Sequence, residues 1–234
     1  MSTAVIKLEN RPRLLDLFCG AGGAAIGYHR AGFEVVGVDI KPQPHYPFEF
    51  IQGDALHHWT LGLSGSHFKT FDAIHASPPC QRYAGISKVW GAQDSHPDHI
   101  AAVRRLLQER GLPYVIENVP GAPLQRPFQL CGSSFGLRVR RHRLFESTLD
   151  VVAPPCDHHW QDADPVYTIR QHGKSMRTGV CYVFGGGQAG QPVATWREAM
   201  DLPNLTVDEL SQAIPPAYTE WIGKQLMEAL KIAA

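Results

Sequence analysis

Three features are missing from this 234-residue sequence, and each absence narrows what the protein can be. Neither sign of charge is in excess, since Lys plus Arg and Asp plus Glu both number 22, so no global field draws the chain to nucleic acid or to an anionic membrane. The five cysteines lack paired spacing, and residues 1–13 contain neither a signal-peptide core nor a membrane-length apolar run. We therefore expect a soluble protein of a reducing compartment, and any contact with nucleic acid must be local.

The chain alternates strand-like apolar runs with segments of helical period, which is typical of an α/β domain with a mainly parallel sheet. Strands are predicted at 13–18, 34–39, 71–76 and 113–116, with shorter candidates at 166–170 and 180–184. Helices are predicted at 24–31, 97–110, 195–202, 207–214 and 217–232. Between Leu144 and Ala194 the periodicity fades into Pro, His, Gly and polar residues, and we interpret this stretch as an inserted small lobe.

A glycine loop follows the first predicted strand, in the run Asp16-Leu-Phe-Cys-Gly-Ala-Gly-Gly23. Glycines let a backbone turn tightly and approach a ligand, and the start of a helix offers free amide donors. Asp39 ends the second predicted strand, where a carboxylate can accept hydrogen bonds from ribose hydroxyls. The loop matches neither the full dinucleotide fingerprint nor a triphosphate loop, so the spacing favours a different adenosine-containing cofactor.

A second motif, Ser77-Pro-Pro-Cys-Gln81, follows the strand predicted at 71–76. It presents Cys80 on a stiff Pro-Pro segment at a strand end, which suits a nucleophile. An isolated cysteine is more often an inert core residue, so the interpretation as a nucleophile depends on the other motifs of the chain.

Five motifs follow one another along the chain: Asp16 to Gly23, Gly53-Asp54, Pro78-Pro-Cys-Gln81, Glu117-Asn-Val119 and Arg141-His-Arg143. In this order they resemble the DNA (cytosine-5)-methyltransferase family, in its small prokaryotic or phage type. The resemblance implies a Rossmann-like, S-adenosylmethionine-dependent fold with a mainly parallel twisted sheet. It also implies a catalytic domain of residues 1–143 and 195–234, and a small target-recognition lobe at 144–194.

The family resemblance assigns roles to the site residues. Cys80 corresponds to the nucleophile that adds to carbon 6 of cytosine, so that carbon 5 attacks the methyl group of S-adenosylmethionine. Glu117 would face ring N3, and Arg143 with Arg141 would contact the carbonyl oxygen and support the site. Duplex DNA hides the target carbon, so base flipping is implied, with residues 81–99 (Gly85, Ser87 and Gly91 among them) as a candidate lid.

The donor site that the resemblance implies begins with the glycine loop, including Gly20, Gly22 and Gly23. Phe18 would pack on the adenine, Asp39 would bind the ribose, and Asp54 would face the adenine amino group. Pro78 would line the junction between donor and base.

The sequence departs from the family pattern at four places. Val139 replaces a common glutamine, Asp39 a more frequent glutamate, and Ile40 an aromatic residue that often stacks on adenine. The segment Ala213 to Tyr218 keeps only the proline part of the terminal motif, which puts donor affinity in question rather than the nucleophile.

The predicted lobe carries Arg170, Lys174 and Arg177, with Gln171 and His172 between them, and these residues could reach bases and phosphates. The run Arg138 to Arg143 is either a solvated face or a strip that contacts phosphate or base. Cys156-Asp-His-His159, with Cys131, has residue types that bind zinc, but there is no paired CxxC, so the sequence predicts no metal site.

Two alternatives remain open: an RNA cytosine-5 methyltransferase on the same fold, and a non-catalytic DNA-binding relative. We expect double-stranded DNA as partner, no membrane contact, a monomer, and a cytoplasmic location in a prokaryotic or phage-infected cell. The sequence does not tell whether a restriction endonuclease is a partner.

Overall fold

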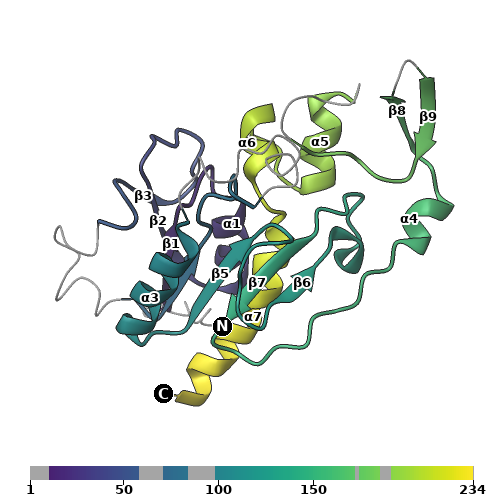
Figure 1. Cartoon of the computed structure of the whole chain (residues 1–234). Helices are drawn as coiled ribbons and strands as arrows, with labels where there is room; N and C mark the ends of the chain where they lie inside the picture. The colour runs from purple at the N-terminus through teal and green to yellow at the C-terminus, as the bar shows by residue number, and fades with distance from the viewer. Residues whose placement is uncertain (1–10, 58–70, 84–97, 172–173, 185–190, 234) are drawn as a thin grey trace, which may run out of the picture.

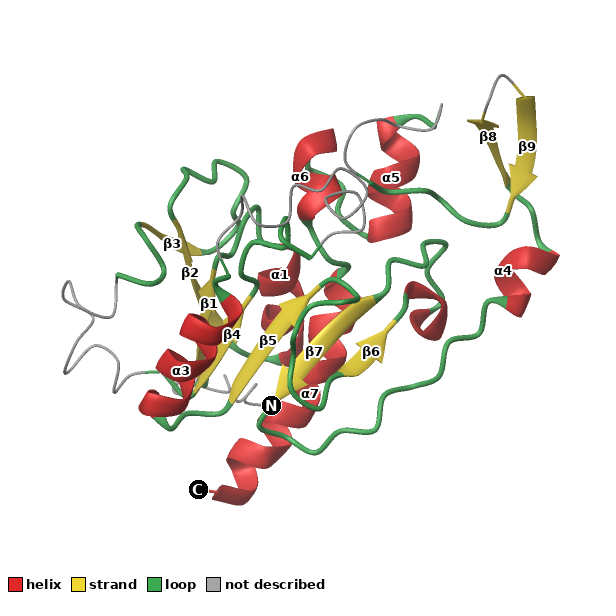
Figure 2. Ribbon diagram, viewed as in Figure 1, coloured by secondary structure: helices red, strands yellow, loops and turns green. Residues whose placement is uncertain are grey.

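A seven-stranded sheet forms the centre of the computed structural model, which describes residues 11–57, 71–83, 98–171, 174–184 and 191–233 (Figures 1 and 2). The strand order is β3-β2-β1-β4-β5-β7-β6. Strands β1 to β5 pair in parallel, and β7 is antiparallel to both of its neighbours. The strands are β1 (Arg13–Leu17), β2 (Glu34–Asp39), β3 (Glu49–Gln52), β4 (Ala73–Ala76), β5 (Tyr114–Asn118), β6 (Phe128–Leu130) and β7 (Arg143–Ser147). The predicted α/β class with a mainly parallel sheet is confirmed.

Helices cover both faces of this sheet, with α3 on one face and α1 and α7 on the other (Figure 2). The helices are α1 (Gly23–Ala31), α3 (Ile100–Arg110), α4 (His159–Ala163), α5 (Val193–Met200), α6 (Val207–Gln212) and α7 (Pro216–Ala233), with a 3-10 turn η3 (Gly132–Phe135). A separate antiparallel hairpin, β8 (Tyr167–Gln171) and β9 (Lys174–Thr178), projects from the body beside α4 (Figure 1).

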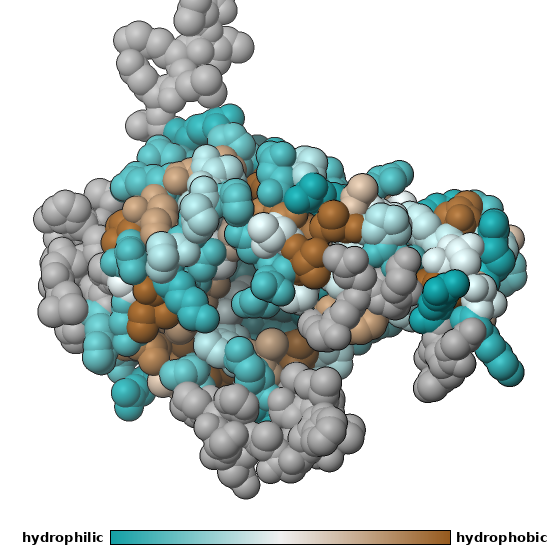
Figure 3. Space-filling view, turned by 90° about the horizontal axis from the view of Figure 1, so that it is seen from above, coloured by the Kyte–Doolittle hydropathy of each residue, from teal (hydrophilic) through white to brown (hydrophobic). Residues whose placement is uncertain are grey.

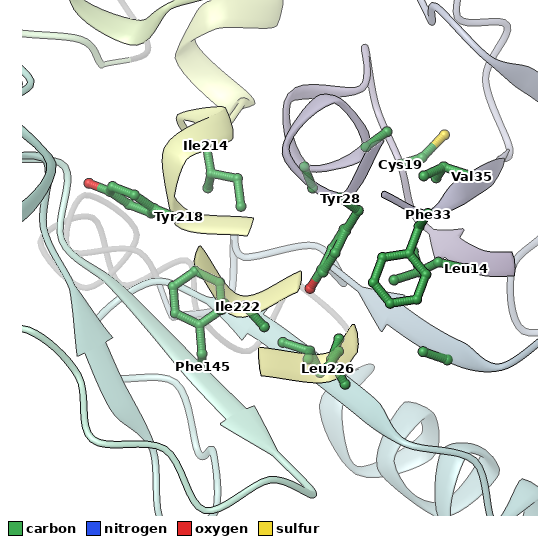
Figure 4. Close-up of a cluster of buried hydrophobic side chains, with 14 of the residues drawn as sticks. Leu14, Cys19, Tyr28, Phe33, Val35, Phe145, Ile214, Tyr218, Ile222 and Leu226 are labelled. Atoms are coloured by element: carbon green, nitrogen blue, oxygen red, sulfur yellow. The ribbon is translucent and has the colours of Figure 1, made fainter. Parts of the chain in front are cut away.

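Alternate residues of the strands fill the two faces of the sheet. Leu14 packs with Tyr28, Phe33 and Ile222 on the side of α1 and α7 (Figure 4). Its neighbour Leu15 packs on the opposite side with the α3 residues, because successive side chains of a strand point to opposite faces. A strand buried on both faces reads as a continuous apolar run, which is why β1 and β2 were visible in the sequence.

Two elements at the antiparallel edge of the sheet, β6 and β7, were not predicted. Residues 144–147 belong to β7, so the chain leaves the sheet after Ser147 rather than at Leu144. The strand predicted at 180–184 is wrong: β8 pairs instead with β9. Segment 180–184 is irregular, and its apolar residues Cys181 and Val183 pack against α5 and α6 rather than into a sheet.

Within the described residues, every helix is too short or too polar to cross a bilayer.

Candidate active site

A cleft of about 470 Å³ opens where the parallel strands end. Its walls come from the segments that follow β1, β2, β4 and β5, together with the α6–α7 connection. Chain connections leave β1 and β4 in opposite directions across the sheet, and ligands of open α/β sheets bind at such a switch point. The cleft therefore lies where the fold favours a binding site.

The glycine loop turns from β1 into α1 beneath this cleft. Phe18 lines the cleft at φ 57°, and Gly22, at φ 89°, is the residue before the first turn of α1. At Gly23 a Cβ would lie 2.6 Å from the carbonyl oxygen of Ile214, so only glycine permits this contact with the α6–α7 connection. Gly20 and Gly23 line the cleft, whereas Gly22 is not among its lining residues.

Asp39 presents a fixed carboxylate at the end of β2. Its Oδ2 accepts a hydrogen bond from the backbone N–H of Gly20 at 3.0 Å, and its Oδ1 accepts one from Lys41 at 3.0 Å. Asp39 lines the cleft, and a carboxylate oxygen that accepts one hydrogen bond can accept another. Beside it, Ile40 lines the same cleft with 64% of its surface exposed, which leaves an apolar face for a flat ring.

Asp54 does not line the cleft. Its Oδ1 accepts a hydrogen bond from the N–H of Leu56 at 2.9 Å, and its Oδ2 lies 3.6 Å from Nδ1 of His57. The carboxylate thus folds back into the turn that follows β3. Its motif does lie beside the cleft, because the N–H of Gly53 donates to the carbonyl of Asp39 at 2.8 Å.

Cys80 is half-buried in the turn after β4 and lines the cleft. The side chain of Asn118 donates to the carbonyl oxygen of Pro78 at 2.9 Å, which ties the Pro-Pro segment to the end of β5. Burial and the nearby Glu117 raise the pKa of the Cys80 thiol, and Arg143 and Arg141 oppose this effect. The free protein therefore holds Cys80 as a thiol. The two arginines would stabilise its thiolate if the negative charge of Glu117 were neutralised.

Glu117 and Arg143 form an ion pair across β5 and β7, with Nε of the arginine 3.0 Å from Oε1 of the glutamate. The side chains are 10% and 14% exposed, and both line the cleft. Burial raises the pKa of Glu117, while Arg143 and a hydrogen bond from Ser77 hold it down. A carboxylate, a guanidinium and a thiol therefore meet in one cavity.

Arg141 has a different role from its neighbour Arg143. It is not among the residues that line the cleft, and its Nη1 and Nη2 donate to the carbonyl oxygens of Val183 at 3.0 Å and Ser211 at 2.6 Å. Burial and Arg143 lower its pKa to about 9, so it remains a cation at neutral pH. Of the two functions expected for Arg141, the geometry matches support of the site.

A buried chain of hydrogen bonds leads to Glu117, and sequence reasoning missed it. Oη of Tyr28 lies 3.0 Å from Nδ1 of His75, and Nε2 of His75 lies 2.9 Å from Oγ of Ser77. Burial lowers the pKa of His75 to about 3, so its imidazole is neutral with one donor and one acceptor. Because Ser77 donates to Glu117, its oxygen accepts from Nε2–H of His75, and Nδ1 then accepts from Tyr28. The one sequence feature that pointed to this hydrogen-bond chain is the position of Ser77 in the motif that contains Cys80.

The terminal segment also contributes to the cleft, although it keeps only the proline part of its motif. Ala213 and Ile214 line the cleft beside Ser211 and Gln212. The residues of the candidate lid at 84–97, including Gly85, Ser87 and Gly91, lie outside the described residues.

The β8–β9 hairpin carries the basic residues expected to face DNA. Arg170 and Arg177 lie on one face of the hairpin, Lys174 lies on the other, and all three are exposed. Arg177 donates to the carbonyl of Pro165 through Nε at 2.9 Å. His172 lies outside the described residues. The surface that carries the hairpin mixes hydrophilic and hydrophobic residues, and no single polar or apolar face dominates it (Figure 3).

Solved structures of other proteins share this fold. In the solved structures the fold resembles a methyltransferase of Entamoeba histolytica, with a TM-score of 0.56 and 12% identity over 95% of this chain and 99% of that chain. It also resembles the Dnmt2 methyltransferase of S. pombe, with a TM-score of 0.54 and 13% identity over 94% and 99% of the two chains. The protein therefore has a Rossmann-like methyltransferase fold.

Sequence comparison gives a similarity to one family. Residues 12–126 match the family described as C-5 cytosine-specific DNA methylase. The chain is 28% identical over 181 residues to the type II methyltransferase M.AplI of Arthrospira platensis, which covers 67% of this chain and 50% of the relative. It is 32% identical over 124 residues to the type II methyltransferase M.AquIA of Picosynechococcus sp., which covers 47% and 49%. The chain spans about half the length of these curated relatives.

Proposed function

We propose that this protein transfers a methyl group from S-adenosylmethionine to carbon 5 of a cytosine in DNA. The observation that carries the proposal is one cleft lined both by the glycine loop after β1 and by Cys80. The buried ion pair of Glu117 and Arg143 lines the same cleft. The match of residues 12–126 to the C-5 cytosine-specific DNA methylase family supports the same function.

The donor half of the cleft fits S-adenosylmethionine, which when bound supplies an electrophilic methyl group. Asp39 offers carboxylate lone pairs to ribose hydroxyls, and Phe18 and Ile40 offer apolar surface to the adenine. The backbone of Gly20 and the first turn of α1 leave room and amide donors for the remainder. For Asp54 to bind the adenine amino group, its carboxylate must give up the hydrogen bond from the N–H of Leu56 and rotate toward the cleft.

The acceptor half supplies covalent catalysis by Cys80. Its sulfur forms a bond to carbon 6 of the ring, and carbon 5 then carries the electron pair that takes the methyl group. Glu117 faces N3 and Arg143 faces the carbonyl oxygen, so both stabilise the charge that addition places on the ring. A base removes the carbon 5 proton, carbon 5 and carbon 6 regain their double bond, and the thiolate leaves.

The substrate is a cytosine extruded from duplex DNA, since a cleft at the sheet edge cannot reach carbon 5 inside a base stack. We infer that residues 144–194 form the target-recognition lobe and that residues 1–143 and 195–234 form the catalytic domain, with residues 144–147 of the lobe segment completing β7 in the sheet. Arg170 and Lys174 on the exposed hairpin contact bases or phosphates. A lobe this small favours a short or relaxed target sequence, and bisulfite sequencing of modified DNA would refute this by revealing a long, strict motif.

We propose a monomer, because the described residues of one chain line the cleft from both the donor and the cysteine side. The cellular setting we propose is the cytoplasm of a prokaryotic or phage-infected cell, with a restriction endonuclease of matching target as a partner to be sought. Sedimentation of the protein with and without DNA tests the monomer, and a dimer in free solution would contradict it.

The decisive experiment incubates the protein with S-adenosylmethionine and duplex DNA that contains 5-fluorocytosine. Fluorine cannot leave as a proton does, so the covalent adduct accumulates and migrates as a shifted band on a denaturing gel. Cys80→Ser should abolish the band. Cys19→Ser is the matched control, because Cys19 lines the same cleft but should not be required.

Each other outcome rejects part of the proposal. An adduct on RNA but not on DNA would identify an RNA cytosine-5 methyltransferase. DNA binding without an adduct on either nucleic acid would favour the non-catalytic relative. An adduct that survives in Cys80→Ser would reject Cys80 as the nucleophile.

A further inference from the structure

Four side chains with metal-binding atoms converge beside the sheet edge, outside the cleft. They are Cys131, His142, Cys156 and His158, and their ligand atoms all lie within 4.8 Å of one another. Three separate segments supply them: the residue after β6, the residue before β7, and the stretch that leads into α4. The sequence offered Cys131, Cys156 and His158 as zinc-binding types but gave no reason to add His142.

The distances within this cluster match a metal site. Sγ of Cys131 lies 3.3 Å from Nε2 of His158, and Sγ of Cys156 lies 3.6 Å from Nε2 of His142. Tetrahedral zinc with Zn–S of about 2.3 Å and Zn–N of about 2.0 Å separates a sulfur from a nitrogen by about 3.6 Å. In the same tetrahedron two sulfurs lie about 3.8 Å apart and two nitrogens about 3.3 Å apart. Ligand atoms that lie within 4.8 Å of one another therefore reach this arrangement with closure of at most about 1–1.5 Å.

The surroundings of the sulfurs suit thiolates. Oγ of Ser133 donates to Sγ of Cys131 at 3.2 Å, and Nε2 of Gln129 lies 3.9 Å from Sγ of Cys156. Ser133 is held in turn, since its Oγ accepts from the N–H of Asp157 at 3.2 Å. Donors of this kind orient metal ligands and stabilise their charged form.

We propose that Cys131, His142, Cys156 and His158 bind one structural zinc ion. Two thiolates and two imidazoles in a tetrahedral arrangement select zinc over magnesium or calcium, which prefer oxygen. Four protein ligands fill the coordination sphere and leave no open position, so the ion stabilises structure and takes no part in catalysis.

The place of the ion explains what it would stabilise. His142 lies between Arg141 and Arg143, and Arg141 holds the strained φ of 22°. Such a backbone conformation is unfavourable by itself and persists only where neighbouring groups fix it. Cys156 and His158 come from the chain that leaves the sheet, so zinc would join the start of the proposed lobe to the segment that presents Arg143 to Glu117. This consequence rests on the proposed function, whereas zinc binding itself does not.

Metal analysis of the full chain tests the proposal. Protein purified without added metal, with any histidine tag removed, should contain about one zinc per chain by mass spectrometry of the elements. His142→Asn and Cys156→Ser should each lose most of it. The matched control is His159→Asn, because His159 is adjacent and exposed but outside the cluster, and it should keep its zinc.

Cobalt titration of the wild-type chain provides a readout that needs no variant to fold. Stoichiometric Co²⁺ should give the visible absorption of a tetrahedral ion with thiolate ligands, and zinc should displace it. No stoichiometric binding of either ion to the reduced protein, or a Cys131–Cys156 disulfide in protein isolated under reducing conditions, would overturn the site. So would zinc retained by both ligand variants.

The same variants separate this proposal from the proposed function. Cys80→Ser should keep the zinc and lose the 5-fluorocytosine adduct, and Cys156→Ser should lose the zinc and show reduced adduct yield. If Cys156→Ser lost zinc with adduct yield unchanged, the site would stand and its link to Arg143 would fall.

Discussion

The ion pair between Arg104 and Glu146 offers a sharp test of how this fold is held together. Arg104 of α3 donates to the glutamate of β7 through Nε at 2.8 Å and Nη2 at 2.7 Å. The side chains are 12% and 4% exposed. Glu146 also accepts from the N–H of Gln125 at 2.7 Å, so the pair joins α3, β7 and the connection that precedes β6.

Replacing Arg104 with methionine keeps the aliphatic bulk and removes the cation. The carboxylate is then buried with neutral donors alone, and loss of one partner of a buried pair costs about 3–5 kcal/mol. For a chain of this size each kcal/mol lowers the melting temperature by about 2–4 °C, so we expect a fall of about 6–20 °C. The double variant Arg104→Met/Glu146→Gln should recover part of the loss, because no uncompensated charge remains.

Thermal and urea unfolding of wild type, both variants and a control measure these free energies. The control is Arg105→Met, whose pair with Glu109 spans 3.8 Å and is 76% and 62% exposed. An exposed pair of this kind contributes about 0–1 kcal/mol. The reasoning is refuted if Arg104→Met costs no more than Arg105→Met, or if the double variant is less stable than Arg104→Met alone.

Three further predictions follow from buried groups. Ser77→Ala removes the donor that holds down the pKa of Glu117, so ¹³C NMR titration should give a higher pKa than in wild type, and an unchanged value would reject that hydrogen bond. Burial raises the pKa of Asp16, whose oxygens have no hydrogen-bond partner in the described part of the chain, so its ionisation destabilises the fold as pH rises. The difference in unfolding free energy between Asp16→Asn and wild type should therefore increase in favour of the variant as the pH rises from about 5 to about 8. Melting curves across this range measure it, and a difference that stays constant would contradict the prediction. Gly27→Ala would put a Cβ 2.1 Å from the carbonyl oxygen of Pro216, so overpacking should cost at least about 1–3 kcal/mol in thermal melts, and a neutral effect would show that α1 and α7 can separate freely.

Segments whose own residues carry the burial pattern were predictable from the sequence. β2 was predicted with the bounds that the structure has, and β1 differs by one residue. The helix expected at 97–110 ends as predicted, at Arg110, where Gly111 adopts φ 68°. Pro97, its expected start, lies outside the described residues.

The antiparallel edge and the hairpin were not predictable in the same way. β9 reads Lys-Ser-Met-Arg-Thr and is mostly exposed, so it has no apolar alternation to recognise, and its partner β8 alone stabilises it. In β7 the two buried residues, Phe145 and Glu146, are adjacent, so the strand shows no alternation. Glu146 is buried because it forms an ion pair with Arg104 of α3, which is distant in sequence. Strands of this kind depend on partners that local periodicity does not reveal.

The sequence by itself determined the residue types of the cleft, because glycine turns, the Pro-Pro-Cys segment and strand-end acids are local features of the chain. The tertiary structure decided which of them meet. Strand order brings the ends of β1, β2, β4 and β5 to one edge, so Asp39, Cys80 and Glu117 share a cavity while Asp54 turns away. The antiparallel return of β7 sets Arg143 against Glu117 and leaves Arg141 to bind carbonyl oxygens elsewhere. Distances between segments remote in sequence depend on how the sheet is ordered, and neither composition nor periodicity encodes them.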